Sequence, residues 1–272
     1  MALERAKTAE TSTEEISQEL SIVYQLGGHA AKEIVGKTKV LEAIANGSVT
    51  KEQFREFALQ RNLAAQSFEE LLTAGIATAT KANDKKLAAV LQANLNDEMG
   101  IDAHGQKHPD QAHETWRKDF YTALGITEDE LKTAEPLKGT KDYCEAIKAL
   151  IEERNYVKIA AVIFALEFSI PMEFRKIAEG RDKIFPEIFT IQENEIPAEM
   201  IEKVRAKVMG VRQYLDDHIQ HDTKSHATDL AAALSQYVST RTSFKEGIYN
   251  GINAVIDAKQ KFYKSLEQAL GL

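Results

Sequence analysis

The sequence offers few places at which a helix must stop. Its 272 residues include only 14 glycines and 5 prolines, and they are rich in Ala, Leu, Glu, Lys and Gln, which lose little side-chain freedom in a helix. Apolar residues recur three or four positions apart, as between Phe54 and Leu72, whereas alternation at period two is hard to find over more than four residues. The chain is therefore predicted to be all-α.

Start and stop signals divide this pattern into helices joined by short connections. Thr50, Asp84 and the Thr127–Glu130 capping box mark helix starts, and Pro171 is expected to kink or end a helix. Glycine stop signals occur at Gly27-Gly28, Gly100, Gly125 and Gly180. The predicted helices cover residues 13–35, 38–46, 50–79, 84–98, 110–124, 139–152, 154–178, 197–237 and 241–270.

Short loops between long helices predict antiparallel neighbours in one helical bundle. We expect a single domain over residues 1–272, with residues 1–12 as a flexible tail. The longest predicted loop lies between Gly100 and Gln111, and a loop of that length often has a function.

Composition excludes several classes of protein. A net charge of -8 argues against a nucleic-acid surface, which needs clustered Lys and Arg. No apolar run approaches the roughly 18 residues of a membrane span, and the first residues lack the apolar core of a signal peptide. The single cysteine, Cys144, excludes an internal disulfide and a cysteine-based metal site. We expect a cytoplasmic protein.

Six of the seven histidines fall into two clusters beside carboxylates. His104, His108 and His113 form the first cluster. The second cluster contains His218, His221 and His226. His218, Asp222 and His226 follow one another at intervals of four residues, so on a helix they advance by about 40° per step and share one stripe. Imidazole and carboxylate ligands suit iron, manganese or zinc.

Two glutamates follow apolar helical stretches. Glu167 comes directly after residues 159–166, which are apolar around the full helix circumference and therefore predict a buried helix. A buried carboxylate must be paired, protonated or bound to a metal, and an ion pair with Arg175 or Lys176 is the alternative to a metal. Glu98 continues the apolar stripe of residues 87–95 and is therefore expected to point inward, whereas Asp97 is expected to point away. The alternative is that Glu98 is a solvated acid at the end of the helix.

Four segments, NLNDEMG, HETWRKDFYTALGI, IFALEFSIPMEF and HIQHDTKSHA, resemble in order the sequence blocks of haem-oxygenase-like dimetal oxidases. The nearest branch is that of the CADD-like proteins, whose fold is related to that of TenA and PqqC. The resemblance covers residues 85–235. Carried over to this chain, it implies these metal ligands: Glu98, His113, Glu167, His218, Asp222 and His226.

The resemblance implies a haem-oxygenase-like helical bundle that binds two iron ions, or iron and manganese, and uses dioxygen as co-substrate. The substrate would be a small amine, amino acid or fatty acid, held against the apolar wall of residues 159–166 with Phe168. The sequence departs from the pattern at His226, which lies one residue later than usual; a π-bulge would restore the geometry. The first loop is also longer, so His104 and His108 are alternatives to His113.

Three rival readings remain open at this point. A metal-free TenA-like hydrolase of the same fold would rely on Cys144 as nucleophile, and a haem oxygenase would use His29. A non-enzymatic interaction protein would use apolar stripes on the N-terminal half of the 13–35 helix and on residues 244–266 as a homodimer face. Core packing is the favoured use of these stripes.

Overall fold

The computed structural model describes residues 2–189, 208, 212, 214–216, 218–219 and 226–272. Within these residues the secondary structure is helical, with one isolated bridge between Ile101 and Lys107, so the all-α prediction is confirmed. The elements are α1 (Ala2–Ile34), α2 (Lys39–Asn46), α3 (Lys51–Lys81), α4 (Lys85–Glu98), the 3-10 helix η1 (Pro109–Gln111), α5 (His113–Ala123), α6 (Glu128–Thr133), α7 (Lys138–Glu152), α8 (Tyr156–Ile184), α9 (Pro186–Phe189), α11 (His226–Val238) and α12 (Thr242–Leu270).

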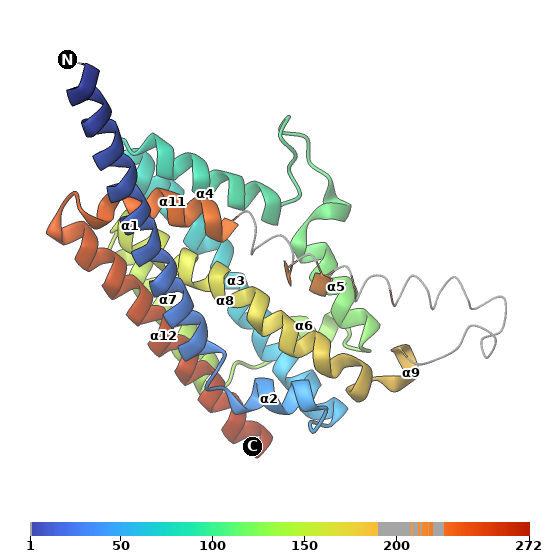
Figure 1. Ribbon diagram of the computed structural model, residues 1–272. Coiled ribbons are helices and arrows are strands. Elements are labelled where there is room, and N and C mark those ends of the chain that lie inside the picture. The colour runs from blue at the N-terminus through green and yellow to red at the C-terminus, as the bar shows by residue number, and fades with distance from the viewer. Residues whose placement is uncertain (1, 190–207, 209–211, 213, 217, 220–225) are drawn as a thin grey trace.

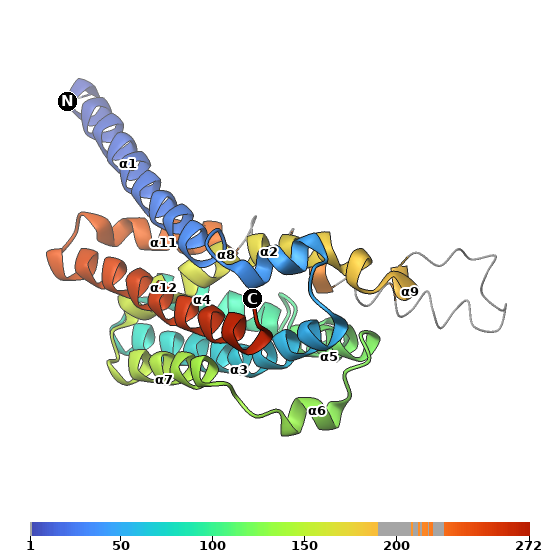
Figure 2. The same ribbon diagram turned by 90° about the horizontal axis from the view of Figure 1, so that it is seen from below.

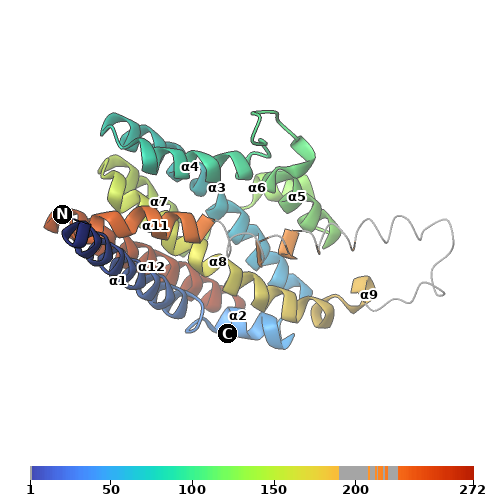
Figure 3. The same cartoon turned by 45° about the horizontal axis from the view of Figure 1, so that its top comes forward.

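Helix α8 is the central element of the bundle. It contacts α1, α2, α3, α11 and α12, while α4 packs on α3 and α11. Figures 1 and 3 show α8 between the layer of α3 and α4 and the layer of α1 and α2. Every residue from Ile159 to Leu166 is buried, as the all-round apolar pattern predicted. This arrangement places Glu167 in the interior, where it is 1% exposed.

Three helix starts agree with their sequence signals. Thr50 and Thr127 each form a complete capping box, and the Asp84 side chain accepts a hydrogen bond from the Leu87 backbone. The apolar stripe of α12 packs into the core against α7 and α8. In the described structure this stripe serves core packing rather than a homodimer face.

Three of the predicted stop signals lie inside helices instead of ending them. Helix α8 continues through Pro171 and Gly180 to Ile184. A Cβ built on Gly180 would lie 1.8 Å from the Ile44 carbonyl oxygen, so this glycine lets α2 approach α8 rather than ending the helix. Gly27 is likewise inside α1, where a Cβ would lie 2.7 Å from Phe164.

Helix α1 begins at Ala2, well before the predicted start at residue 13. Its first turns project beyond the other helices (Figures 1 and 2). Most of the helix predicted over 197–237 lies outside the described residues, which resume as a continuous helix at His226. No described helix is both long and apolar enough to cross a membrane.

Candidate metal centre

Glu98 and His113 are brought together by the loop between α4 and α5. Glu98 is the last residue of α4 and His113 the first of α5. Gly100 has a φ of +65° and its carbonyl accepts a hydrogen bond from the His108 backbone, which turns the chain back. The Nδ1 atom of His113 donates to Oε1 of Glu98 over 3.0 Å.

The Glu98 carboxyl is charged in this environment. Burial raises its pKa, but the opposing contact with His113, assisted by His218 and Arg117, is stronger and brings the pKa to about 2. The His113 side chain is only 7% exposed, and its ring stacks on Trp116 with 5.2 Å between centroids. A charged carboxylate beside a buried imidazole is a pair of donors suited to a divalent cation.

His218 lies next to the pair formed by Glu98 and His113. Its ring centroid lies 4.6 Å from that of His113, and it stacks on Phe174 at 4.4 Å. Its Nδ1 lies 2.9 Å from the Tyr214 carbonyl oxygen; since a carbonyl only accepts, Nδ1 carries the proton. Burial, together with His113, lowers the pKa of His218 to about 3. The ring is therefore neutral at pH 7, and its Nε2 lone pair is available to a metal.

A second group forms around Glu167. Its Oε1 lies 3.6 Å from Nδ1 of His226 and has no hydrogen-bond partner among the described residues. The Nε2 atom of His226 donates to Oδ2 of Asp97 over 2.7 Å. Pro171 has no N–H, so it donates no helical hydrogen bond to the Glu167 carbonyl. A carboxylate that orients a histidine facing a second carboxylate is a common arrangement around protein metals.

The two groups are joined at the end of α4. Asp97 contacts His226 and the adjacent Glu98 contacts His113, so consecutive acids reach different groups. The Asp97 side chain is 58% exposed, as expected for a residue that points away from the inward face, yet its Oδ2 reaches His226. Sequence reasoning missed this contact because only the position of α11 shows that a second imidazole lies there.

The donors fit iron or manganese in chemical type, but their convergence is incomplete. Among the residues that the structure describes, no three His, Cys, Asp or Glu side chains form a group that could hold a metal ion. The predicted ligand Asp222 lies outside the described residues. The unpartnered Oε1 of Glu167 and the neutral ring of His218 are the observations that favour a cation at these positions.

The alternative ligands and rival residues lie elsewhere. His104 is exposed, and His108 contacts Asp102 at 3.2 Å within the loop. His29 is exposed on α1, which does not suit a buried haem ligand. Cys144 is half-buried, and burial raises the pKa of its thiol, which opposes a nucleophilic role. Of the predicted partners of Glu167, Lys176 pairs instead with Glu42.

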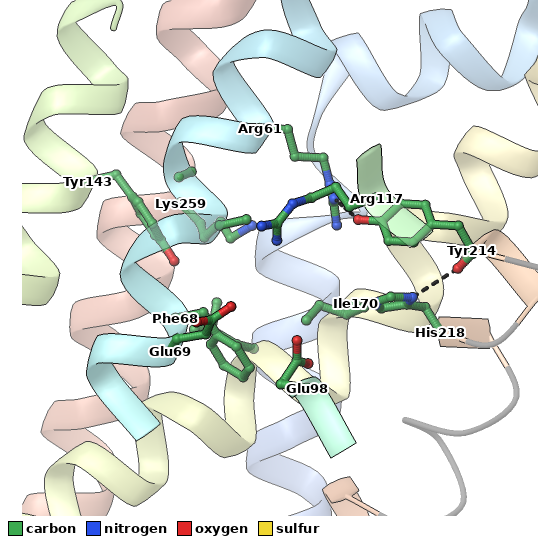
Figure 4. Close-up of a pocket in the computed structure, with 13 residues that line it drawn as sticks. Arg61, Phe68, Glu69, Glu98, Arg117, Tyr143, Ile170, Tyr214, His218 and Lys259 are labelled. Atoms are coloured by element: carbon green, nitrogen blue, oxygen red, sulfur yellow. Dashed lines mark hydrogen bonds between the residues drawn. The ribbon is translucent and has the colours of Figure 1, made fainter. Parts of the chain in front are cut away.

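A cavity of about 70 Å³ opens beside Glu98 and His218. Leu166 lines it, whereas Phe164 and Phe168, expected in the same wall, pack against Gly27 of α1. Figure 4 shows basic side chains entering from one side and carboxylates from the other. The lining residues are Arg61, Ala64, Ala65, Phe68, Glu69, Glu98, Arg117, Tyr143, Leu166, Ile170, Tyr214, His218 and Lys259.

Comparison with known families places the chain. The model of a haem-oxygenase-like family described as "iron-containing redox enzyme" matches residues 55–260. The chain belongs to this family. The match contains all six predicted metal ligands, the cavity and helix α8.

Solved structures share the fold of this iron-containing redox enzyme. A CADD-like protein of unknown function from Nostoc punctiforme is similar with a TM-score of 0.69 at 18% identity, covering 93% of this chain and 98% of that chain. A second crystal structure from the same organism gives a TM-score of 0.64 at 16% identity, covering 92% and 96%. A TenA homologue from Pseudomonas syringae gives 0.68 at 9% identity, covering 91% and 92%. The search of curated protein sequences gives no match.

Proposed function

We propose that this chain is a dioxygen-dependent, non-haem dimetal oxidase that acts on a small organic substrate. Glu98, His113 and His218 would hold one ion, and Glu167, Asp222 and His226 the other. The observation that carries the proposal is a pair of carboxylate–imidazole contacts, Glu98 with His113 and Glu167 with His226. The two contacts are linked through α4, because Asp97, the neighbour of Glu98, binds His226.

The charges around Glu98 and around Glu167 favour bound cations over a purely structural role for these acids. A buried acid with an unpartnered oxygen is costly, and a bound cation removes that cost. Three imidazoles and three carboxylates would leave two divalent ions with a net charge near +1. Two ferrous ions bound there would supply the electrons that reduce dioxygen.

The residues of the chain would prepare the site for these ions. The Tyr214 carbonyl fixes the His218 tautomer and the Asp97 carboxylate fixes that of His226, so each ring presents one defined nitrogen. Phe174 stacks on His218 and limits rotation of the ring. Leu166 and the buried turns before Glu167 exclude water from that side.

Trp116 allows a direct test because it is the single tryptophan and stacks on His113. Anaerobic titration with Fe²⁺ or Mn²⁺ is expected to change its fluorescence, and metal analysis should then find about two ions per chain. Glu167→Ala and His218→Ala should each lose metal. The matched control, His104→Ala, removes an exposed histidine and should bind like the parent. A folded parent that binds no metal contradicts the proposal.

A further inference from the structure

The end of the cavity away from Glu98 is basic. Arg61 and Lys259 both line the cavity, yet their side chains are only 13% and 10% exposed. They come from helices far apart in sequence, α3 and α12. In Figure 4 they reach the cavity from the side opposite Glu69 and Glu98.

These two buried cations share one buried carboxylate. The Nε atom of Arg61 donates to Oε1 of Glu173 over 2.6 Å, and Nζ of Lys259 lies 3.4 Å from Oε2 of the same residue. Glu173 is fully buried and does not line the cavity. One formal positive charge therefore remains uncompensated within this trio.

The ammonium group of Lys259 has little other polar contact. Its Nζ lies 5.5 to 5.7 Å from the ring centroids of Tyr143, Phe262 and Tyr263. Burial lowers the pKa of Lys259 even though Glu173 opposes this effect. A buried cation in this state gains most from an added anion.

The size and lining of the cavity restrict that anion. Arg117 lines the same cavity as a third cation, whereas Glu69 and Glu98 line its opposite side, so the basic end suits an anionic group. The volume of about 70 Å³ suits a compact one. Between the basic end and His218 the lining is apolar, with Ala64, Phe68 and Ile170. A carboxylate attached to an aliphatic chain matches both parts of this surface.

We propose that Arg61 and Lys259 bind the carboxylate of a small aliphatic acid, whose chain lies along the apolar wall toward Glu98 and His218. The claim that the aliphatic chain of this acid carries the reacting position rests on the proposed function. The binding of its carboxylate by Arg61 and Lys259, which we call the anchor, does not. The arrangement selects against amines and alcohols of equal length, because neither can neutralise the trio.

The test compares binding of hexanoate, hexanol and hexylamine to the full-length protein by calorimetry, after chelation and again with Mn²⁺. Hexanoate alone is expected to bind, in both states. Lys259→Met should weaken hexanoate by at least about tenfold, because it leaves Arg61 and Glu173 as a neutral pair. Lys264→Met, on the exposed face of α12, is the matched control and should bind like the parent.

The outcomes separate the two proposals. If hexanol binds as well as hexanoate, if hexanoate does not bind, or if Lys259→Met binds it unchanged, the anchor is wrong whatever the metal content. A protein that binds hexanoate through Lys259 but takes up no Fe²⁺ or Mn²⁺ supports the anchor and contradicts the oxidase. Should Lys259→Met fail to fold, Lys259→Gln, which keeps a polar side chain beside Glu173, must show the same loss of hexanoate binding.

Discussion

Removing the charge of Glu173 should destabilise the fold severely. The carboxyl is buried, which raises its pKa, but Lys259 and Arg61 outweigh this and bring it to about 2, against an ordinary value of 4.5. At about 1.4 kcal/mol per pKa unit, this difference corresponds to about 3 kcal/mol of stability at neutral pH. Breaking a buried ion pair by removing one partner costs about 3–5 kcal/mol. Glu173→Gln should therefore lose about 3 kcal/mol or more of its free energy of unfolding.

Urea denaturation of the metal-free protein at neutral pH measures this loss. The matched variant Lys259→Met keeps the pair of Arg61 and Glu173 and should be within about 1 kcal/mol of the parent. The double variant should recover part of the loss, because a single buried cation then remains. A Glu173→Gln protein within about 0.5 kcal/mol of the parent would refute the reasoning.

The same group predicts a pH dependence. Because the folded pKa of Glu173 lies below the unfolded one, its contribution is fully present above about pH 4.5 and is lost as the pH falls toward 2. The parent should lose stability over this range more steeply than Glu173→Gln. Equal slopes for the two proteins would show that Glu173 is not held in its charged form.

Two further substitutions test the packing and the metal centre. Gly180→Ala should cost about 1–3 kcal/mol in urea denaturation, because its Cβ would meet the Ile44 carbonyl, whereas Gly28→Ala, with open space around it, should be neutral or slightly stabilising; equal effects would contradict the close approach of α2 and α8. Glu167→Leu should leave the chelated protein as stable as the parent or more so, and should abolish the rise in melting temperature that Mn²⁺ gives the parent. Unfolding of this variant, with no metal effect on the parent, would make Glu167 a structural partner of His226.

Much of the fold could be predicted from local sequence signals. The capping boxes at Thr50 and Thr127 depend on neighbouring residues only, and the all-round apolar stretch before Glu167 has one outcome, burial. Pro171 and Gly180 misled because their usual effect is local, whereas here packing of α8 against its neighbours decides. The sequence around Gly180 does not show that the backbone of α2 occupies the space that a side chain at this position would fill.

The candidate site was predictable in part. The resemblance singles out Glu98, His113, Glu167 and His226, and the structure places Glu98 beside His113 and Glu167 beside His226. The trio around Glu173 could not be predicted, because Arg61 lies 112 positions from Glu173 and Lys259 lies 86 positions from it. In sequence, these cations look like the polar residues of any amphipathic helix.

Several expectations stay predictions. They concern the single-domain organisation with its flexible first residues, the cytoplasmic location, the homodimer and the small-molecule substrate. The metal-binding roles of the six predicted ligands, Asp222 among them, also stay predictions. The identity of the metals, iron with iron or iron with manganese, belongs to the proposed function.

Anomalous diffraction at the iron edge, from crystals grown with Fe²⁺ without oxygen, tests the central claim most directly. The account predicts two peaks within the bundle. One should be bound by Glu98, His113 and His218, and the other by Glu167 and His226. An iron-free bundle, or iron bound only at surface carboxylates, would contradict it.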